Sequence, residues 1–112
     1  MRKTLSNDKV HQTVQATVTN FHAEIVSEIE KAIATHEWVI VGMAQNPVVA
    51  KARKMLDARG IKYHYIQYGS YFSEWKKRLA IKLWSGWPTF PQIFHKGILI
   101  GGADDLEKYM PV

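Results

Sequence analysis

One stretch decides the fold of this 112-residue chain: Trp87-Pro88-Thr89-Phe90-Pro91-Gln92-Ile93-Phe94, then His95-Lys96-Gly97, then Ile98-Leu99-Ile100-Gly101-Gly102-Ala103-Asp104-Asp105-Leu106. Two short β-rich runs, 92–94 and 98–100, flank three residues that suit a tight turn, so the stretch predicts a β-hairpin. Two glycines then allow a sharp turn, and the acids after them favour a helix over 103–109. Proline cannot donate to a strand ladder, and at such a position it often marks an edge or a cis peptide bond.

The first part of the chain predicts a helix followed by a buried strand. Apolar residues recur at helical spacing between 16 and 35, at Val18, Phe21, Ile25, Ile29 and Ile33. Residues 38–41 form a continuous apolar run, which is typical of a strand buried on both faces. Residues 1–12 are predicted to be a flexible N-terminal tail, and residues 13–112 a single domain.

A second helix is predicted from position 47 to about 59. Asn46 suits the N-cap, Pro47 suits the first helical position, and Gly60 is a typical residue just beyond a helix end. The residues expected to face inward are Val49, Ala52, Leu56 and, less strongly, Met55.

The middle of the chain predicts a second strand and a third helix. Residues 61–67 alternate in part and indicate a strand. Residues 73–84 indicate a helix that Ser85-Gly86 ends, with Trp75, Leu79 and Leu83 on one apolar stripe.

The order of these elements predicts an α/β domain. The first two strands, joined through a helix, form a parallel pair with a right-handed crossover. The last two form the antiparallel hairpin. The expected architecture is therefore a four-stranded mixed sheet flanked by helices, with an extra N-terminal helix, which is the thioredoxin-like arrangement.

The sequence Trp-Pro-Thr-Phe-Pro-Gln at 87–92, followed by a hairpin and Gly-Gly-x-Asp at 101–104, resembles the second half of a glutaredoxin of the single-cysteine type. The resemblance implies the glutaredoxin fold and a cis proline at 91 that faces the active site. It also implies glutathione as the small-molecule ligand. The residues that it assigns to ligand binding are Arg78, Lys82, Trp87, Thr89, Phe90, Pro91, Gly101, Gly102, Ala103 and Asp104.

Within this implied groove, Phe90 and Pro91 would offer backbone groups to the ligand, and Ala103 with Asp104 would hold its γ-glutamyl end. Arg78 and Lys82 would approach a carboxylate. Each residue also has a plainer interpretation. The two cations lie four residues apart on one helix and would then be solvated, and Asp104 would serve only the helix dipole. The tryptophans would belong to the core.

The chain contains no cysteine, which excludes disulfides, thiolate metal sites and cysteine nucleophiles. Counting back from Gly60, the family's Cys-Pro-Tyr-Cys motif falls on 46–49, so Asn46 occupies the nucleophile position and no catalytic residue is assigned. By the same resemblance, Met43 replaces a lysine and Ala103 replaces a cysteine common in single-cysteine members. An iron–sulfur cluster of the family kind needs thiolate ligands and is not expected.

The net charge of +5 is concentrated in one segment. Residues 51–96 hold ten lysines or arginines against two acids, a net charge of +8. Such a segment could attract an anionic tripeptide, an acidic protein or nucleic acid, or it could be a solvated surface. The five histidines (11, 22, 36, 64 and 95) lack metal-ligand spacing and are interpreted as structural. With no apolar run of about 20 residues and a polar N-terminus, we expect a cytoplasmic protein without a membrane partner.

Three hypotheses for function follow. The first is a non-catalytic glutaredoxin-like module that retains a groove for glutathione or an extended acidic peptide and acts through a protein partner. The second is a thiol–disulfide oxidoreductase, the usual family assignment, which would need a thiol from elsewhere. The third is a binder of acidic surfaces or nucleic acid, which is disfavoured because aromatic side chains are not interleaved with the basic ones.

Overall fold

The computed structural model of the chain describes residues 12–70 and 73–110, with side chains described from residue 23 onward. The elements follow the order α1 (Gln12–Thr35), β1 (Trp38–Gly42), α2 (Pro47–Ala58), β2 (His64–Gln67), α3 (Trp75–Ser85), β3 (Gln92–His95), β4 (Ile98–Gly101) and α4 (Ala103–Tyr109). This order confirms the predicted succession of helices and strands.

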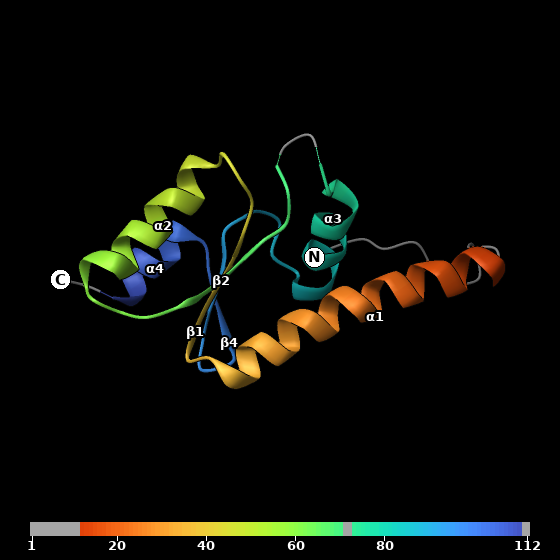
Figure 1. Cartoon of the computed structure of the whole chain (residues 1–112), viewed down its shortest axis with the longest axis horizontal. Coiled ribbons are helices and arrows are strands. Elements are labelled where there is room, and N and C mark those ends of the chain that lie inside the picture. The colour runs from red at the N-terminus through yellow and green to blue at the C-terminus, as the bar shows by residue number, and fades with distance from the viewer. Residues whose placement is uncertain (1–11, 71–72, 111–112) are drawn as a thin grey trace.

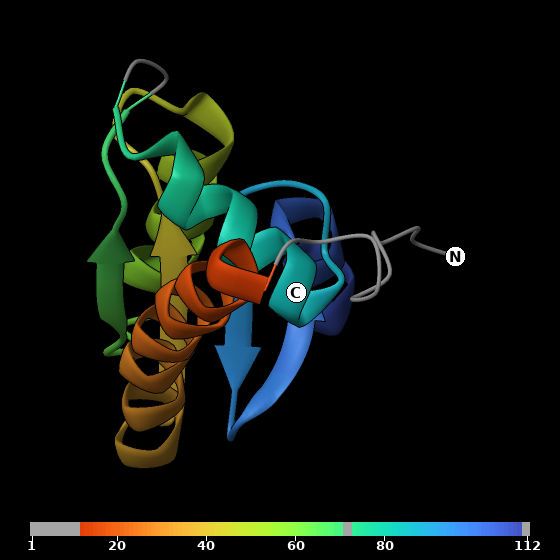
Figure 2. The ribbon, with the colours of Figure 1, turned by 90° about the vertical axis from the view of Figure 1, so that its right-hand side faces the viewer.

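The four strands form one mixed sheet in the order β2-β1-β3-β4. β1 runs parallel to β2 and antiparallel to β3, and β3 pairs with β4 as an antiparallel hairpin. Figure 2 shows α1 and α3 in front of the sheet, and Figure 1 shows α2 and α4 on its other side. This is the thioredoxin-like architecture that the sequence predicts.

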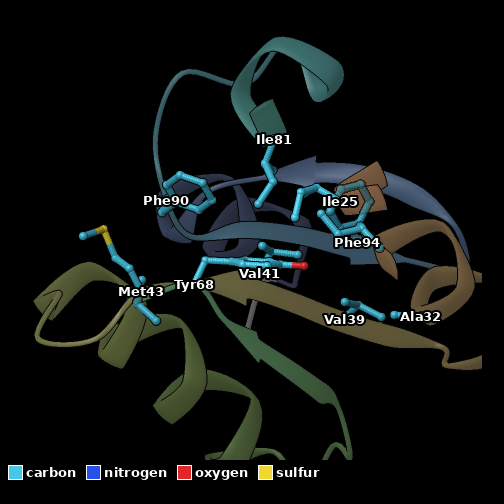
Figure 3. Packing of buried hydrophobic residues seen from close by; sticks show 11 residues of the cluster. Ile25, Ala32, Val39, Val41, Met43, Tyr68, Ile81, Phe90 and Phe94 are labelled. Carbon is cyan, nitrogen blue, oxygen red and sulfur yellow. The ribbon is translucent and has the colours of Figure 1, made fainter. Parts of the chain in front are cut away.

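Two hydrophobic clusters hold the helices to the two faces of the sheet. Val39 and Val41 of β1 join the cluster under α1 and α3, whereas Trp38 and Ile40 join the cluster under α2 and α4. This alternation follows from the two-residue period of a strand, and it confirms that β1 is buried on both faces. The first cluster, drawn in Figure 3, consists of Ile25, Ile29, Ala32, Val39, Val41, Met43, Val49, Tyr68, Ile81, Phe90 and Phe94. Fully burying one large apolar side chain stabilises a fold by about 1.5–3 kcal/mol.

Helix α2 begins and ends as its sequence predicts. The Asn46 side chain caps its start, and Pro47 occupies the first turn. At its end, Gly60 has a φ of 67° and donates its N–H to Asp57 O at 3.0 Å, while Ile61 donates to Leu56 O at 3.0 Å. These two bonds form a Schellman motif, which satisfies carbonyls that the helix leaves open. Val49, Ala52 and Leu56 are buried, as expected.

The predicted hairpin is also confirmed. Lys96 and Gly97 form its turn with positive φ values of 52° and 79°, the geometry of a two-residue turn that matches strand twist. The Phe90–Pro91 peptide bond is cis, and β3 begins directly after it. At the start of α4, the Gly102 N–H donates to Asp105 Oδ2 at 3.0 Å, so the acids do lie at a helix start.

The predicted apolar stripe on α3 is wrong. Trp75 is 58% exposed and Leu79 is 47% exposed, whereas Arg78, Ala80 and Ile81 are the buried residues of this helix. The physical reason is the guanidinium of Arg78, which turns inward and donates from Nη1 to the carbonyl oxygens of Tyr68, at 2.8 Å, and Ser73. That orientation points the large apolar side chains at positions 75 and 79 outward.

Several predicted boundaries shift. Helix α3 begins at Trp75 rather than at 73. Strand β2 begins at His64 rather than at 61, because the pairing with β1 starts where His64 lies opposite Val39. Helix α1 begins at Gln12 rather than 16, so this residue belongs to the helix and not to the predicted tail. The rest of the predicted tail, 1–11, lies outside the described residues, as do the side chains of Val18 and Phe21. None of the described helices has both the length and the apolar character needed to cross a membrane.

Candidate functional site

Several of the predicted site residues lie where the C-terminal end of β1 meets the N-terminal end of β3. Val41 pairs with Gln92, so the loop that follows β1 lies at the same end of the sheet as the cis bond before Pro91. Two backbone bonds fix that loop against the end of β2, because Tyr68 donates its N–H to Gly42 O at 2.9 Å and Ala44 donates to Gly69 O at 2.7 Å.

Asn46 occupies the start of α2 and uses its amide oxygen on the helix itself. Its Oδ1 accepts the N–H groups of Val48 at 2.9 Å and Val49 at 3.1 Å. In a protein with a cysteine at a helix start, such N–H groups and the helix dipole stabilise the thiolate. Here they are bonded to a neutral carboxamide, which neither ionises near neutral pH nor attacks a disulfide. The position therefore caps the helix.

Trp87, Pro91 and Gly102 lie side by side next to the cis bond. A Cβ atom placed on Gly102 would come 3.7 Å from the carbonyl oxygen of Pro91 and 3.7 Å from Trp87 Nε1. Lys82 Nζ lies 5.7 Å from the centroid of the Phe90 ring, the residue before the cis bond. The structure thus brings five of the predicted ligand-binding residues into one neighbourhood.

Two polar atoms in this neighbourhood are buried without a partner among the described residues. They are Trp87 Nε1 and Gln92 Oε1. The Gln92 amide also donates from Nε2 to Trp87 O at 3.1 Å, which ties the loop before the cis bond to the first residue of β3. Sequence reasoning did not assign Gln92 a role, although it follows the Phe-Pro pair directly.

Most of the predicted ligand-binding residues near the cis bond are buried. Phe90 and Ala103 are 7% and 2% exposed, and both side chains belong to the hydrophobic clusters. Pro91 and the two glycines at 101 and 102 are buried as well. Thr89 and Asp104 are the exposed residues of the predicted set, and Lys82 and Trp87 are half-buried. The accessible surface at this place therefore comes mainly from Thr89 and Asp104, with part of Lys82 and Trp87.

Asp104 faces helix α2. Its Oδ1 lies 3.7 Å from Lys51 Nζ, and Lys51 is also 3.6 Å from Glu107 Oε2. The Asp104 side chain is 89% exposed, so this ion pair contributes at most about 1 kcal/mol and leaves the carboxylate open to another cation. Sequence reasoning missed Lys51, because nothing local links it to a residue more than fifty positions later.

The position of Arg78 matches neither a solvated cation nor an open cation that awaits a carboxylate, the two interpretations of the sequence. It is neither solvated nor an open cation, since it is 7% exposed and its Nη1 is bonded to two backbone carbonyls. Its role as a ligand-binding residue stays a prediction.

Comparison with known proteins decides the family. The glutaredoxin family profile matches residues 45–100. A "Glutaredoxin-like protein" of Dictyostelium discoideum is 44% identical over 100 residues, which cover 89% of this chain and 81% of that protein. The chain belongs to the glutaredoxin family.

Other relatives of this glutaredoxin-family protein are larger or more distant. "Monothiol glutaredoxin-S17" of Arabidopsis thaliana is 34% identical over 82 residues, and the match spans 70% of this chain but 16% of that protein. Among solved structures, a buckwheat glutaredoxin–glutathione complex superposes with a TM-score of 0.70 at 22% identity, covering 80% of this chain and 83% of that one. The fold is therefore that of glutaredoxins, as the sequence predicts.

Proposed function

We propose that this glutaredoxin-family protein is a non-catalytic binding module whose groove takes glutathione or an extended acidic peptide. The observation that carries the proposal is Asn46. The family resemblance aligns it with the nucleophile position, and its amide oxygen accepts both N–H groups that would otherwise favour a thiolate. With no cysteine anywhere in the chain, its own residues cannot form a mixed disulfide.

The chemistry around the cis bond supports ligand binding. Asp104 offers an exposed carboxylate to an amine, and Lys82 offers an ammonium to a carboxylate. Between them, backbone groups at 90–91 and 102 suit an extended peptide, which binds mainly through its main chain. A relative of the same fold has been solved as a glutathione complex.

The exposed face of α3 supports a role through a protein partner. Trp75 and Leu79 project on the same helix as Lys82, and Lys76 Nζ lies 5.8 Å from the centroid of the Trp75 ring. An apolar pair bordered by lysines suits a peptide that carries both acidic and apolar side chains. The partner we propose is therefore an acidic polypeptide. The compartment we propose is the cytoplasm.

Replacing Asp104 with asparagine should weaken glutathione binding about tenfold, because a charge-assisted bond to the ligand amine becomes a neutral one. Calorimetric titration with reduced glutathione measures the loss. Glu107→Gln is the matched control: it removes the same charge, from the other carboxylate near Lys51. Its affinity should stay within about twofold of the unmodified protein, since surface charges act weakly at a distance. Equal losses in both variants would argue against the proposed site, and an absence of heat at millimolar glutathione would remove glutathione as the ligand.

A further inference from the structure

A cavity lies at the end of the sheet opposite the cis bond before Pro91. Its volume is about 650 Å³, and it is lined where β1 and β2 begin and where β3 ends. The register there pairs Trp38 with His95 and Val39 with His64. This volume is in the range of small-molecule sites. The proposed function does not involve this cavity.

Positively charged or protonatable side chains dominate the cavity. His36, Lys62, His64 and His95 line it, against the single carboxylate of Glu37. That carboxylate is already engaged, because Glu37 Oε2 lies 3.2 Å from His95 Nε2. His95 is further fixed by its other ring nitrogen, 2.7 Å from the Tyr109 hydroxyl, and by stacking on Trp38 at 3.9 Å. The other three lining bases have no ion-pair partner among the described residues.

The ring of His36 is oriented by the end of α1. Its Nδ1 lies 3.2 Å from Ala32 O and 3.0 Å from Thr35 Oγ1. A carbonyl oxygen can only accept, so the hydrogen-bond network assigns the proton of the neutral ring to Nδ1. The other nitrogen, Nε2, then carries the lone pair of the neutral ring.

His64 stacks on this ring with a centroid separation of 4.2 Å and an interplanar angle of 17°. The arrangement does not suit a metal ion, which needs ring lone pairs that converge on one point. The lone pairs of two stacked rings lie in parallel planes and do not converge. The described residues also contain no group of three metal-ligating side chains. Two protonated rings at this separation would repel each other, and a bound anion would offset that repulsion.

We propose that this cavity binds a phosphate-bearing small molecule and takes up protons as it does so. Lys62 and the stacked pair, His36 and His64, would supply N–H donors to three phosphate oxygens. The apolar lining of Trp38, Ile61 and Tyr63 would receive the organic part of the ligand. Because binding and protonation are coupled, affinity rises as the pH falls through the range in which imidazoles take up protons.

Charged side chains on the neighbouring helices α1 and α2 also lie near this cavity. A neighbouring cavity shares His36 and His64 and adds Glu24, Glu28 and Lys31 from α1. Glu28 accepts a 2.7 Å hydrogen bond from the Tyr68 hydroxyl, and Glu24 and Lys31 line the same cavity as Glu28. From α2, Arg53 Nε donates to the Tyr63 hydroxyl at 3.1 Å. The neighbouring wall therefore adds two carboxylates and one ammonium beyond the phosphate site, whose own donors are Lys62, His36 and His64.

The test is a titration of the full-length protein with phenyl phosphate at pH 6.0 and pH 7.8, followed by calorimetry and by the NMR signals of the histidine rings. The affinity should be at least about tenfold tighter at pH 6.0, and calorimetry in two buffers should report proton uptake. Sulfate, whose charge is constant across this range, should show the same trend, which separates protonation of the protein from protonation of the ligand.

Lys62→Gln and His64→Gln should each weaken binding at pH 6.0 by about tenfold. Lys54→Gln, which removes one charge from the exposed face of α2, is the matched control and should change the affinity by less than about twofold. The proposal is overturned by an absence of saturable binding at pH 6.0, by equal losses at 54 and 62, or by ring shifts that leave His36 and His64 unmoved.

Discussion

Asn46→Cys should carry a thiol with a pKa about 2 units below its ordinary value of about 8.5. The structure provides the reason: the N–H groups of Val48 and Val49 point at this side chain from 2.9 and 3.1 Å. Both donors, with the positive end of the α2 dipole, favour a thiolate over a neutral thiol. The pH dependence of thiolate absorbance and of alkylation by iodoacetamide measures this pKa.

The control for this variant is Ala50→Cys, which places a thiol on an exposed position within the same helix. Its pKa should stay close to about 8.5, because the dipole effect fades within the first turn. If both thiols titrate alike, position 46 is not an activating position, and its alignment with the family's cysteine fails. If the Asn46→Cys protein also gains glutathione-dependent reduction of a mixed disulfide, the missing sulfur is the main barrier to activity.

Arg78→Met should lower the free energy of unfolding by about 3 kcal/mol. The variant keeps much of the side chain's volume but leaves the carbonyl oxygens of Tyr68 and Ser73 without their buried donor. Urea unfolding at pH 7 measures the loss. Lys76→Met, which removes one charge from an exposed position on the same helix, should change stability by no more than about 0.5 kcal/mol.

The same pair of variants separates the two roles of Arg78. A protein that stays as stable as the unmodified one but loses glutathione binding would contradict the structural role and restore the role that the family resemblance implies. A destabilised variant whose folded fraction binds glutathione normally would place Arg78 entirely within the fold.

Local signals explain why most of the fold could be predicted. Asn46-Pro47 and Gly60 define the ends of α2 by themselves, and Lys96-Gly97 defines the hairpin turn. Each of these features depends on backbone preferences within a few residues, so the sequence alone reveals it.

Contacts between distant segments explain the failures. The orientation of α3 depends on Arg78 reaching the carbonyls of Tyr68 and Ser73, and no periodicity encodes that choice. The stacked pair of His36 and His64 likewise arises because the end of α1 meets the start of β2. Their spacing in the sequence gives no sign of this contact, and it predicts only structural roles for both histidines. Tertiary packing therefore determines the buried face of α3 and the stacking of the two histidines, which the hydrophobic pattern and the residue spacing do not reveal.

The most direct test of the proposed groove is an NMR titration of the unmodified, isotopically labelled protein with reduced glutathione. Saturable shifts are predicted for the Trp87 indole N–H, which is buried and has no partner among the described residues, and for the backbone N–H groups of Gly102 and Asp104. No covalent product is expected. Spectra that stay unchanged up to about 10 mM ligand, beyond the range of weak specific binding, would contradict the central claim. That claim is that the protein still binds glutathione although it has no cysteine.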